Sequence, residues 1–145
     1  MREIKFKIYF EDEEPFMSEP ISLVDLLHED WIEFENKDNT LSLPLKDFRF
    51  YYQPNKNYKI MQYTGLKDKN GTEIYEGDIV SIEIMEGEKE TAKVEYSENY
   101  AQYVITSTGI VYLEHEPLCD FIDRGIEVIG NIYDNPELLK GEENG

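Results

Sequence analysis

Cysteine is nearly absent from this chain, which has a single one at Cys119. One cysteine cannot form an internal disulfide, and a chain without disulfides fits a reducing compartment. Histidine is also scarce, because His28 and His115 are the only two in 145 residues. Zinc sites need three or four ligands, and structural zinc sites take them from cysteine and histidine. The sequence therefore offers little material for a zinc site of this composition.

Long apolar runs are absent as well. No run approaches the roughly 20 residues that a helix needs to cross a bilayer. The chain starts with alternating charged and apolar residues, MREIKFKIYF, and not with the apolar segment of a signal peptide. From these absences we expect a soluble, cytoplasmic protein with no membrane partner.

Basic residues are greatly outnumbered, 14 against 32 acidic ones, so the formal net charge is −18. This charge argues against general affinity for nucleic acid, because phosphate binding requires cations that release counterions. The exception is the segment 46–69, where six basic and two acidic residues give +4 and leave −22 for the remainder. Such a segment is consistent with a contact between subunits, with a partner site or with a solvated loop region.

Aromatic residues are plentiful, with 11 Tyr and 7 Phe, and several interleave with the basic residues of segment 46–69. Single-stranded nucleic acids stack on surfaces of this composition. Alternation in an ordinary strand explains the same aromatic residues equally well. The candidate interaction patch consists of Arg49, Tyr51, Tyr52, Lys56, Tyr58, Lys59, Tyr63, Lys67 and Lys69.

The apolar pattern is mostly that of short strands separated by turns. In residues 4–10 the apolar side chains alternate, which predicts a strand with one buried face and Tyr9 on the other face. Ser22 is the predicted N-cap of a short helix, because leucines follow it at helical spacing. Further strands are predicted over residues 31–34, 40–43, 48–52, 58–63, 78–85, 90–96, 100–106, 109–113 and 126–133, and short helices over 117–124 and 136–140.

Two glycine turns divide the stretch 60–80, IMQYTGLKDKNGTEIYEGDIV, around which the chain is organised. The pair Asn70-Gly71 predicts a tight turn with positive φ at both positions, followed by a strand that begins near Glu73. Gly77 predicts a second turn, after which Ile79 and Val80 continue as a strand.

These elements predict a mainly β fold of the α+β class. We expect a small, strongly bent sheet or a partly open SH3-like barrel with one or two short helices. No repeat or long linker divides the chain. The prediction is therefore a single domain over residues 1–139, followed by a flexible tail over 140–145.

Three blocks of this sequence resemble the YopX family of small proteins encoded by bacteriophages and prophages. They are MQYTGLKDKNGTEIYEGDIV at 61–80, MREIKFK at 1–7 and IEVIGNIYDNPELL at 126–139. The sequence departs from the family at residues 8–10, where a Trp is expected, and residues 18–53 look private to this protein. The resemblance implies a YopX-like domain and a phage or prophage origin, hence the cytoplasm of a bacterial host. The resemblance does not assign a catalytic or binding role to any particular residue.

The only cluster of metal-capable side chains surrounds His115, with Glu114, Glu116 and Cys119. His115 and Cys119 would share a helix face if the helix began before Pro117, but a surface histidine beside glutamates is the simpler interpretation. The glycines near residue 71 lack the spacing of a phosphate-binding loop. We assign no catalytic residue, no cofactor and no metal ligand from the sequence.

We therefore expect a non-enzymatic protein that binds a host or phage protein, either alone or as a homo-oligomer. One alternative is an acidic mimic of DNA that inhibits a host nucleic-acid-binding protein, because carboxylates at phosphate-like spacing would present the necessary charge. Another is weak nucleic-acid binding through the segment Lys46 to Lys69.

Overall fold

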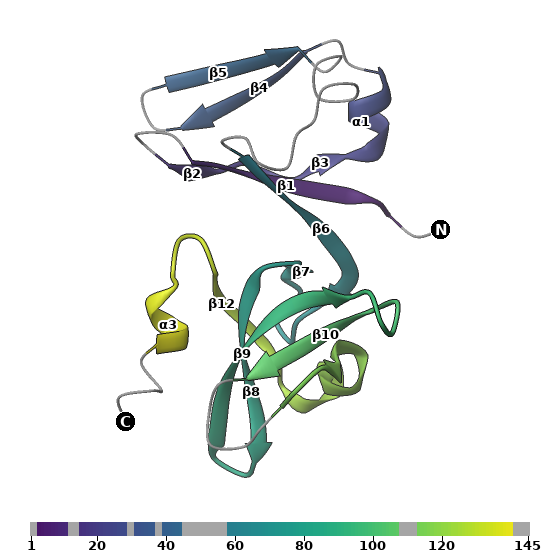
Figure 1. Cartoon of the computed structure of the whole chain (residues 1–145), viewed down its shortest axis with the longest axis vertical. Helices are drawn as coiled ribbons and strands as arrows, with labels where there is room; N and C mark the ends of the chain where they lie inside the picture. The colour runs from purple at the N-terminus through teal and green to yellow at the C-terminus, as the bar shows by residue number, and fades with distance from the viewer. Residues whose placement is uncertain are drawn as a thin grey trace. The chain divides into compact units, whose positions relative to one another are not determined.

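The computed structural model describes residues 3–11, 15–28, 31–36, 39–44, 58–107 and 113–140 (Figure 1). The chain forms two compact units, residues 1–62 and 63–145. It is mainly β, with two larger antiparallel sheets, one of them a strongly curled half-barrel, and few short helices, as predicted. Compactness does not decide whether the units fold together, so the single domain over 1–139 stays a prediction.

The first unit is built on β1 (Lys5–Phe10). On one side β1 pairs with the first half of β6 (Tyr58–Lys67), and on the other with β2 (Phe16–Met17) and β3 (Ile21–Ser22), always antiparallel. The alternation of apolar residues predicts that only one face of β1 is buried. That expectation is wrong at Tyr9, which is buried together with its neighbours on both sides, so both faces of this end of the strand are covered.

Local hydrogen bonds begin the first helix, α1 (Leu23–His28), as predicted. The Ser22 hydroxyl accepts a hydrogen bond of 3.1 Å from the amide of Asp25, which is the N-cap interaction. The predicted hairpin follows, formed by β4 (Trp31–Asn36) and β5 (Asn39–Pro44) in continuous register. The strand predicted over residues 48–52 lies outside the described residues.

The second unit contains the half-barrel, whose strands lie in the order β11-β10-β9-β8-β12. The second half of β6 pairs with β7 instead, and all these pairings are antiparallel. This sheet confirms the predicted strong bend, while the likeness to SH3 barrels stays a prediction. The bounds are β7 (Glu73–Tyr75), β8 (Asp78–Met85), β9 (Glu88–Ser97), β10 (Gln102–Ser107), β11 (Glu116–Pro117) and β12 (Glu127–Asn131).

Two short helical segments complete the second unit, the 3-10 helix η1 (Leu118–Arg124) and α3 (Glu137–Lys140). Both confirm predicted helices. Gly125 ends η1 in the left-handed conformation with φ of 72°, which a residue with a Cβ adopts only with strain. Within the part of the chain that the structure describes, no helix is long and apolar enough to cross a membrane.

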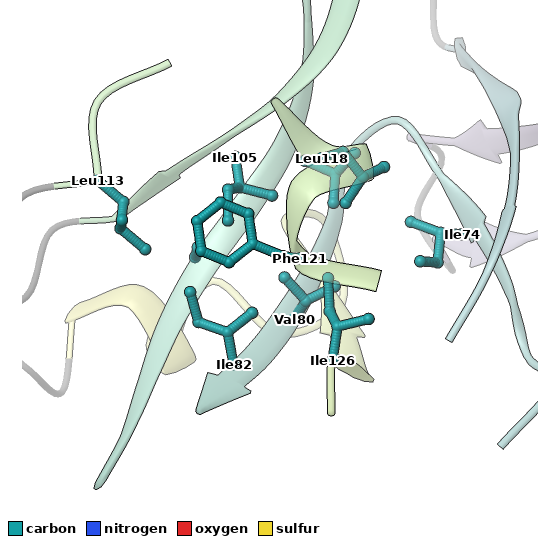
Figure 2. Packing of buried hydrophobic residues seen from close by; sticks show 10 residues of the cluster. Ile74, Val80, Ile82, Ile105, Leu113, Leu118, Phe121 and Ile126 are labelled. Atoms are coloured by element: carbon teal, nitrogen blue, oxygen red, sulfur yellow. The ribbon is translucent and has the colours of Figure 1, made fainter. Parts of the chain in front are cut away.

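The core of the second unit fills the inner face of the half-barrel (Figure 2). Period-two alternation places Ala92 and Val94 of β9 on this face, and η1 adds Leu118 and the ring of Phe121. Burial of a side chain as large as Val, Leu or Phe stabilises the fold by about 1.5–3 kcal/mol, and burial of the Ala92 methyl group contributes less. The other buried members are Ile74, Val80, Ile82, Ile105, Leu113 and Ile126.

One end of this core is polar. Glu90 is 4% exposed. It precedes Ala92 by two residues in β9 and therefore lies on the same face of that strand. Its carboxyl accepts a hydrogen bond from the buried hydroxyl of Ser107, in the neighbouring strand β10. The other carboxyl oxygen is buried without a partner among the described residues. A buried oxygen in this state costs free energy, so the core is not optimised for stability at this end.

The last strand, β12, ends at Asn131, two residues earlier than predicted. The side chain of Asn131 ends it, because its Oδ1 accepts hydrogen bonds from the amides of Tyr133 (3.0 Å) and Asp134 (2.9 Å). Such an Asx turn diverts the backbone from the sheet. Asn135 closes the turn, since its Oδ1 accepts a bond of 3.3 Å from the amide of Asn131.

Gly130 fits against Asn135 only because it has no side chain. A Cβ at this position would lie 2.5 Å from Asn135 Oδ1 and 2.8 Å from Asn135 Cγ, and both distances are shorter than real Cβ contacts. We predict that Gly130→Ala lowers the free energy of unfolding by about 1–3 kcal/mol, because Asn135 must move and release the amide of Asn131. Urea denaturation followed by circular dichroism measures the change.

The double variant Gly130→Ala with Asn135→Ala is the control. If the steric conflict with Asn135 is the cause, adding Gly130→Ala to Asn135→Ala costs much less than adding it to the wild type. Equal costs in the two backgrounds would contradict this explanation.

Candidate functional site

The interaction patch expected from the sequence is only partly within the described residues. Arg49, Tyr51, Tyr52 and Lys56 lie outside them, and Tyr58 is described by its backbone alone. The structure therefore leaves untested whether the nine residues form one surface.

The other four residues of that patch have different environments. Lys59 is half-buried in the first unit, whereas Lys67 and Lys69 are exposed in the second. Tyr63 is only 7% exposed, and its ring centroid lies 5.4 Å from that of Tyr75. Because a buried ring offers almost no surface to a partner, Tyr63 acts here in packing.

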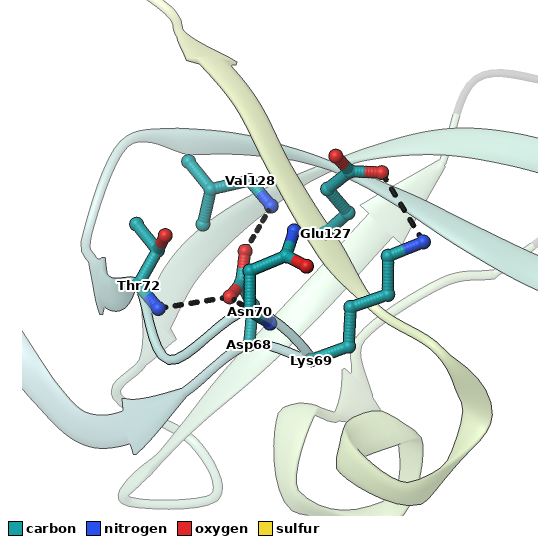
Figure 3. Close-up of polar contacts among 6 residues, drawn as sticks. All are labelled: Asp68, Lys69, Asn70, Thr72, Glu127 and Val128. Atoms are coloured by element: carbon teal, nitrogen blue, oxygen red, sulfur yellow. Dashed lines mark hydrogen bonds and ion pairs between the residues drawn. The ribbon is translucent and has the colours of Figure 1, made fainter.

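A turn between β6 and β7 is organised by the carboxylate of Asp68, which is 7% exposed (Figure 3). Oδ1 accepts hydrogen bonds from the amides of Asn70 (2.8 Å) and Thr72 (2.9 Å). Oδ2 accepts one of 2.9 Å from the amide of Val128 in β12. The Lys69 amide also donates to the carbonyl of Ile126 at 3.0 Å. The turn is thereby fastened to a strand sixty residues further along the chain.

The predicted tight turn is present, but Asn70 and Gly71 are not its two central residues. The amide of Gly71 donates a hydrogen bond of 3.0 Å to the carbonyl of Asp68, which places Lys69 and Asn70 at the centre of the turn. Positive φ is found at Gly71 (81°) but not at Asn70. The Asp68 carboxylate fixes this position of the turn, because it accepts hydrogen bonds from the amides of Asn70 and Thr72.

Burial alone would raise the pKa of the Asp68 carboxyl, but its environment lowers it below the ordinary value. The amides of Val128, Thr72 and Asn70 donate hydrogen bonds to the charged form, and the nearby Lys69 charge adds to them. Both oxygens are thus already occupied by backbone donors. The group is suited to holding the fold, and it would have to release these amides to bind a metal or accept a proton from a substrate.

The second glycine turn uses its polar groups in the same way. The Asp78 carboxylate accepts a hydrogen bond of 2.8 Å from the amide of Tyr75, and Gly77 between them has the predicted positive φ, 84°. The Tyr75 hydroxyl donates to Glu73 at 3.2 Å. Burial, together with the negative charge of Glu73, raises the pKa of Tyr75 well above its ordinary value, so this phenol stays protonated.

The cluster around His115 is not arranged on one helix face. His115 has a φ of 57° and precedes η1, which begins at Leu118. The thiol of Cys119 is exposed, with its Sγ 3.8 Å from Asp120 Oδ1. In the ranges that the structure describes, no three His, Cys, Asp or Glu side chains gather in a way that could hold a metal ion.

Among the residues whose burial the structure describes, the exposed aromatic side chains gather at the hairpin of β9 and β10. We call Tyr96, Tyr100 and Tyr103 the tyrosine rim. Tyr96 and Tyr103 are directly paired across the strands, with ring centroids 5.3 Å apart in an edge-to-face contact. Tyr103 packs against the core, while Tyr96 is 45% exposed. Tyr100 is 65% exposed in the connecting turn, where the Ser97 hydroxyl accepts a bond of 3.4 Å from its amide.

Sequence reasoning missed the tyrosine rim, although it had a signal. Three tyrosines occur within the eight residues 96–103. The sequence predicts Tyr96 at the end of one strand and Tyr100 and Tyr103 within the next, where aromatic residues usually pack. Exposure could not be inferred, because it depends on where the strands end relative to the core. The large exposed apolar side chains of the described residues are Val24, Met85, Tyr96, Tyr100 and Ile129.

Comparisons with protein families and with solved structures find matches that cover most of this chain. A family model described as YopX protein matches residues 18–140. The crystal structure of protein EF1440 from Enterococcus faecalis is similar, with a TM-score of 0.55 and 26% sequence identity, over 94% of this chain and 97% of that chain. No curated protein matches.

We predict that Asp68→Ala lowers the free energy of unfolding by about 2–3 kcal/mol, because three amides lose a charged acceptor. Lys69→Ala is the matched control in the same turn. Its ion pair with Glu127 (3.4 Å) is well exposed, so its loss should cost less than about 1 kcal/mol. Urea denaturation at neutral pH measures both, and equal losses would contradict a special role for Asp68.

The stability that Asp68 provides should depend on pH. Because its folded-state pKa lies below the unfolded value of about 3.9, the contribution is fully present above that pH. It is lost as the pH falls through the folded-state pKa. The difference in unfolding free energy between wild type and Asp68→Asn should therefore shrink from pH 6 to pH 3. A constant difference over this range would show that the charge of Asp68 does not matter.

Proposed function

The chain belongs to the YopX family, and we propose that it acts by binding another protein and not by catalysing a reaction. The observation that carries the proposal is the tyrosine rim. Tyr96, at the end of β9, and Tyr100, in the turn that follows, are both exposed, and Tyr103 packs on the core. Tyrosine is enriched at protein interfaces because it buries a large area at low entropic cost.

The polar groups of the YopX-like blocks support the same proposal. Asp68, Asp78, Asn131 and Asn135 all accept backbone hydrogen bonds within the second unit. Side chains that are used in this way build structure, and chemistry at these positions would compete with folding. A binding protein needs a stable scaffold and an exposed surface. These four residues provide the scaffold, and the tyrosine rim provides the surface.

The partner that we propose is a protein of a bacterial host or of a phage, met in the host cytoplasm. This follows from the phage or prophage origin that the YopX resemblance implies. A homo-oligomer is compatible with the same surface, since an interface between copies would also bury tyrosines.

Acidic mimicry of DNA is the second candidate, and the distribution of charge favours it. Residues 63–145 carry 19 acidic and 6 basic side chains, a balance of −13, whereas residues 1–62 carry 13 and 8, a balance of −5. The negative charge is thus concentrated in the unit that contains the half-barrel. A strongly negative unit attracts the basic surface of a nucleic-acid-binding protein.

Weak nucleic-acid binding through segment 46–69 has less support. Of its aromatic residues, Tyr63 is buried, and the charge of Lys69 is already paired with Glu127. Both would have to contribute to a stacking or phosphate-binding surface.

A pull-down with tagged protein from host lysate tests the proposal, with bound proteins eluted in steps of rising salt and identified by mass spectrometry. We expect a defined partner that wild type retains and that Tyr96→Ala with Tyr100→Ala loses. Met85→Ala is the control, because Met85 is also a large exposed side chain (60%) but does not belong to the tyrosine rim. It is the last residue of β8 and pairs with Glu88, at the start of β9. Light scattering of the free protein measures self-association in parallel.

The salt at which the partner elutes distinguishes the two candidates. A partner retained at high salt supports a hydrophobic protein interface, while a nucleic-acid enzyme released at moderate salt supports mimicry, because exposed charges are screened. Recovery of the tagged protein alone, together with turnover in a substrate screen, would overturn the proposal of a binding protein.

A further inference from the structure

We propose that the tyrosine rim binds arginine side chains of a basic protein segment, an inference that rests on the proposed binding function and specifies its partner. Carboxylates accompany the exposed rings of the rim, and the basic residue nearest to them in the sequence, Lys93, is paired with Glu95 at 3.6 Å. Residues 94–103 include Glu95 and Glu98 but no lysine or arginine. Aromatic faces attract a guanidinium group, and carboxylates accept its hydrogen bonds.

The rim is organised before any partner arrives. The edge-to-face contact with Tyr103 restrains the ring of Tyr96 at the border of the core. The turn that carries Tyr100 is restrained by the hydrogen bond to Ser97, and it includes Ala101 with a φ of 51°. A ring that is already ordered loses little entropy on binding, so its contact with a cation contributes more to affinity.

The carboxylates of the rim differ in how much of their charge is available. Glu95 lies 3.6 Å from Lys93 and accepts a hydrogen bond of 2.7 Å from Thr106, so it is partly neutralised. Glu98 is exposed in the turn between Tyr96 and Tyr100. We therefore assign Glu98 as the carboxylate that selects a cationic partner beside the rings.

Charge decides between this occupant and the alternatives. The unit that carries the rim has a balance of −13, which repels a second copy of the chain as well as nucleic acid. Among cations, arginine suits the site better than lysine, because its planar guanidinium stacks on a ring and is more weakly hydrated. In a basic segment that contains arginine, the guanidinium group can stack on the rings and donate hydrogen bonds to the carboxylate of Glu98.

Titration of the isotope-labelled full chain with a nona-arginine peptide, followed by NMR, tests the proposal, with nona-lysine as the comparison. We expect the amide shifts to concentrate in residues 95–103, and nona-arginine to bind more tightly than nona-lysine. Tyr100→Ala and Glu98→Gln should each weaken nona-arginine binding about two- to five-fold. Tyr100→Phe keeps the aromatic ring, so it should leave nona-arginine binding unchanged. Met85→Ala should do the same, because Met85 lies at the end of β8, beside the start of β9.

Folding of each variant is verified by its unchanged amide spectrum outside the turn. Equal binding of both peptides, with shifts spread over the acidic residues and no effect of Tyr100→Ala, would reduce the contact to general electrostatics and overturn the proposal. A dimer in light scattering that Tyr100→Ala dissociates would also overturn it, since the rim would then belong to a second copy.

The binding of arginine by the rim and the proposed binding function are tested separately. If Tyr96→Ala with Tyr100→Ala still retains a partner from lysate, the protein binds through another surface, and only the assignment of the rim is wrong. If the rim binds nona-arginine as expected but no partner is recovered, the recognition chemistry is supported while the binding function loses its support.

Discussion

A buried carboxylate that accepts three backbone hydrogen bonds joins the entry of the second unit to its last strand. Asp68 bonds two amides of its own turn and one of β12, and the neighbouring Lys69 amide bonds a β12 carbonyl. The strand β12 lies at the end of the half-barrel, where unpaired backbone groups would otherwise face a possible new strand. The turn covers part of this edge, so one side chain both shapes the loop and completes the sheet.

Features set by neighbouring residues were predictable, and features set by distant ones were not. Ser22 caps α1 and Gly77 takes positive φ because each requirement is local. The bond between Asp68 and Val128 joins residues sixty apart and leaves no local pattern, and the same carboxylate helps to centre the tight turn on Lys69 and Asn70 instead of on Asn70 and Gly71. Exposure is equally nonlocal: alternation predicted one buried face for β1, but Tyr9 is covered as well. For the candidate site, the tyrosines were visible as a cluster, but their exposure was not.

The binding function that we propose assigns structure and recognition to different residues of the second unit. The stretches that resemble the YopX family place their carboxylates and amides against backbone groups, so these positions are committed to the fold. The tyrosine rim lies between those stretches in the sequence, in a hairpin that the core holds from one side through Tyr103. Such a hairpin turn can change its outward side chains with little effect on the scaffold. In the proposed function, the blocks at 61–80 and 126–139 therefore supply the scaffold, while the tyrosine rim supplies the contact with a partner.

The scarcity of cysteine has a practical consequence once the fold is known. Cys119 is the only thiol of the chain, and it is exposed on η1, which packs on the half-barrel through Leu118 and Phe121 on its other side. A maleimide dye, spin label or photoreactive cross-linker will therefore attach at one defined point, without any engineered cysteine and without entering the core. The native chain thus supplies its own reporter position, from which distances to a bound partner can be measured.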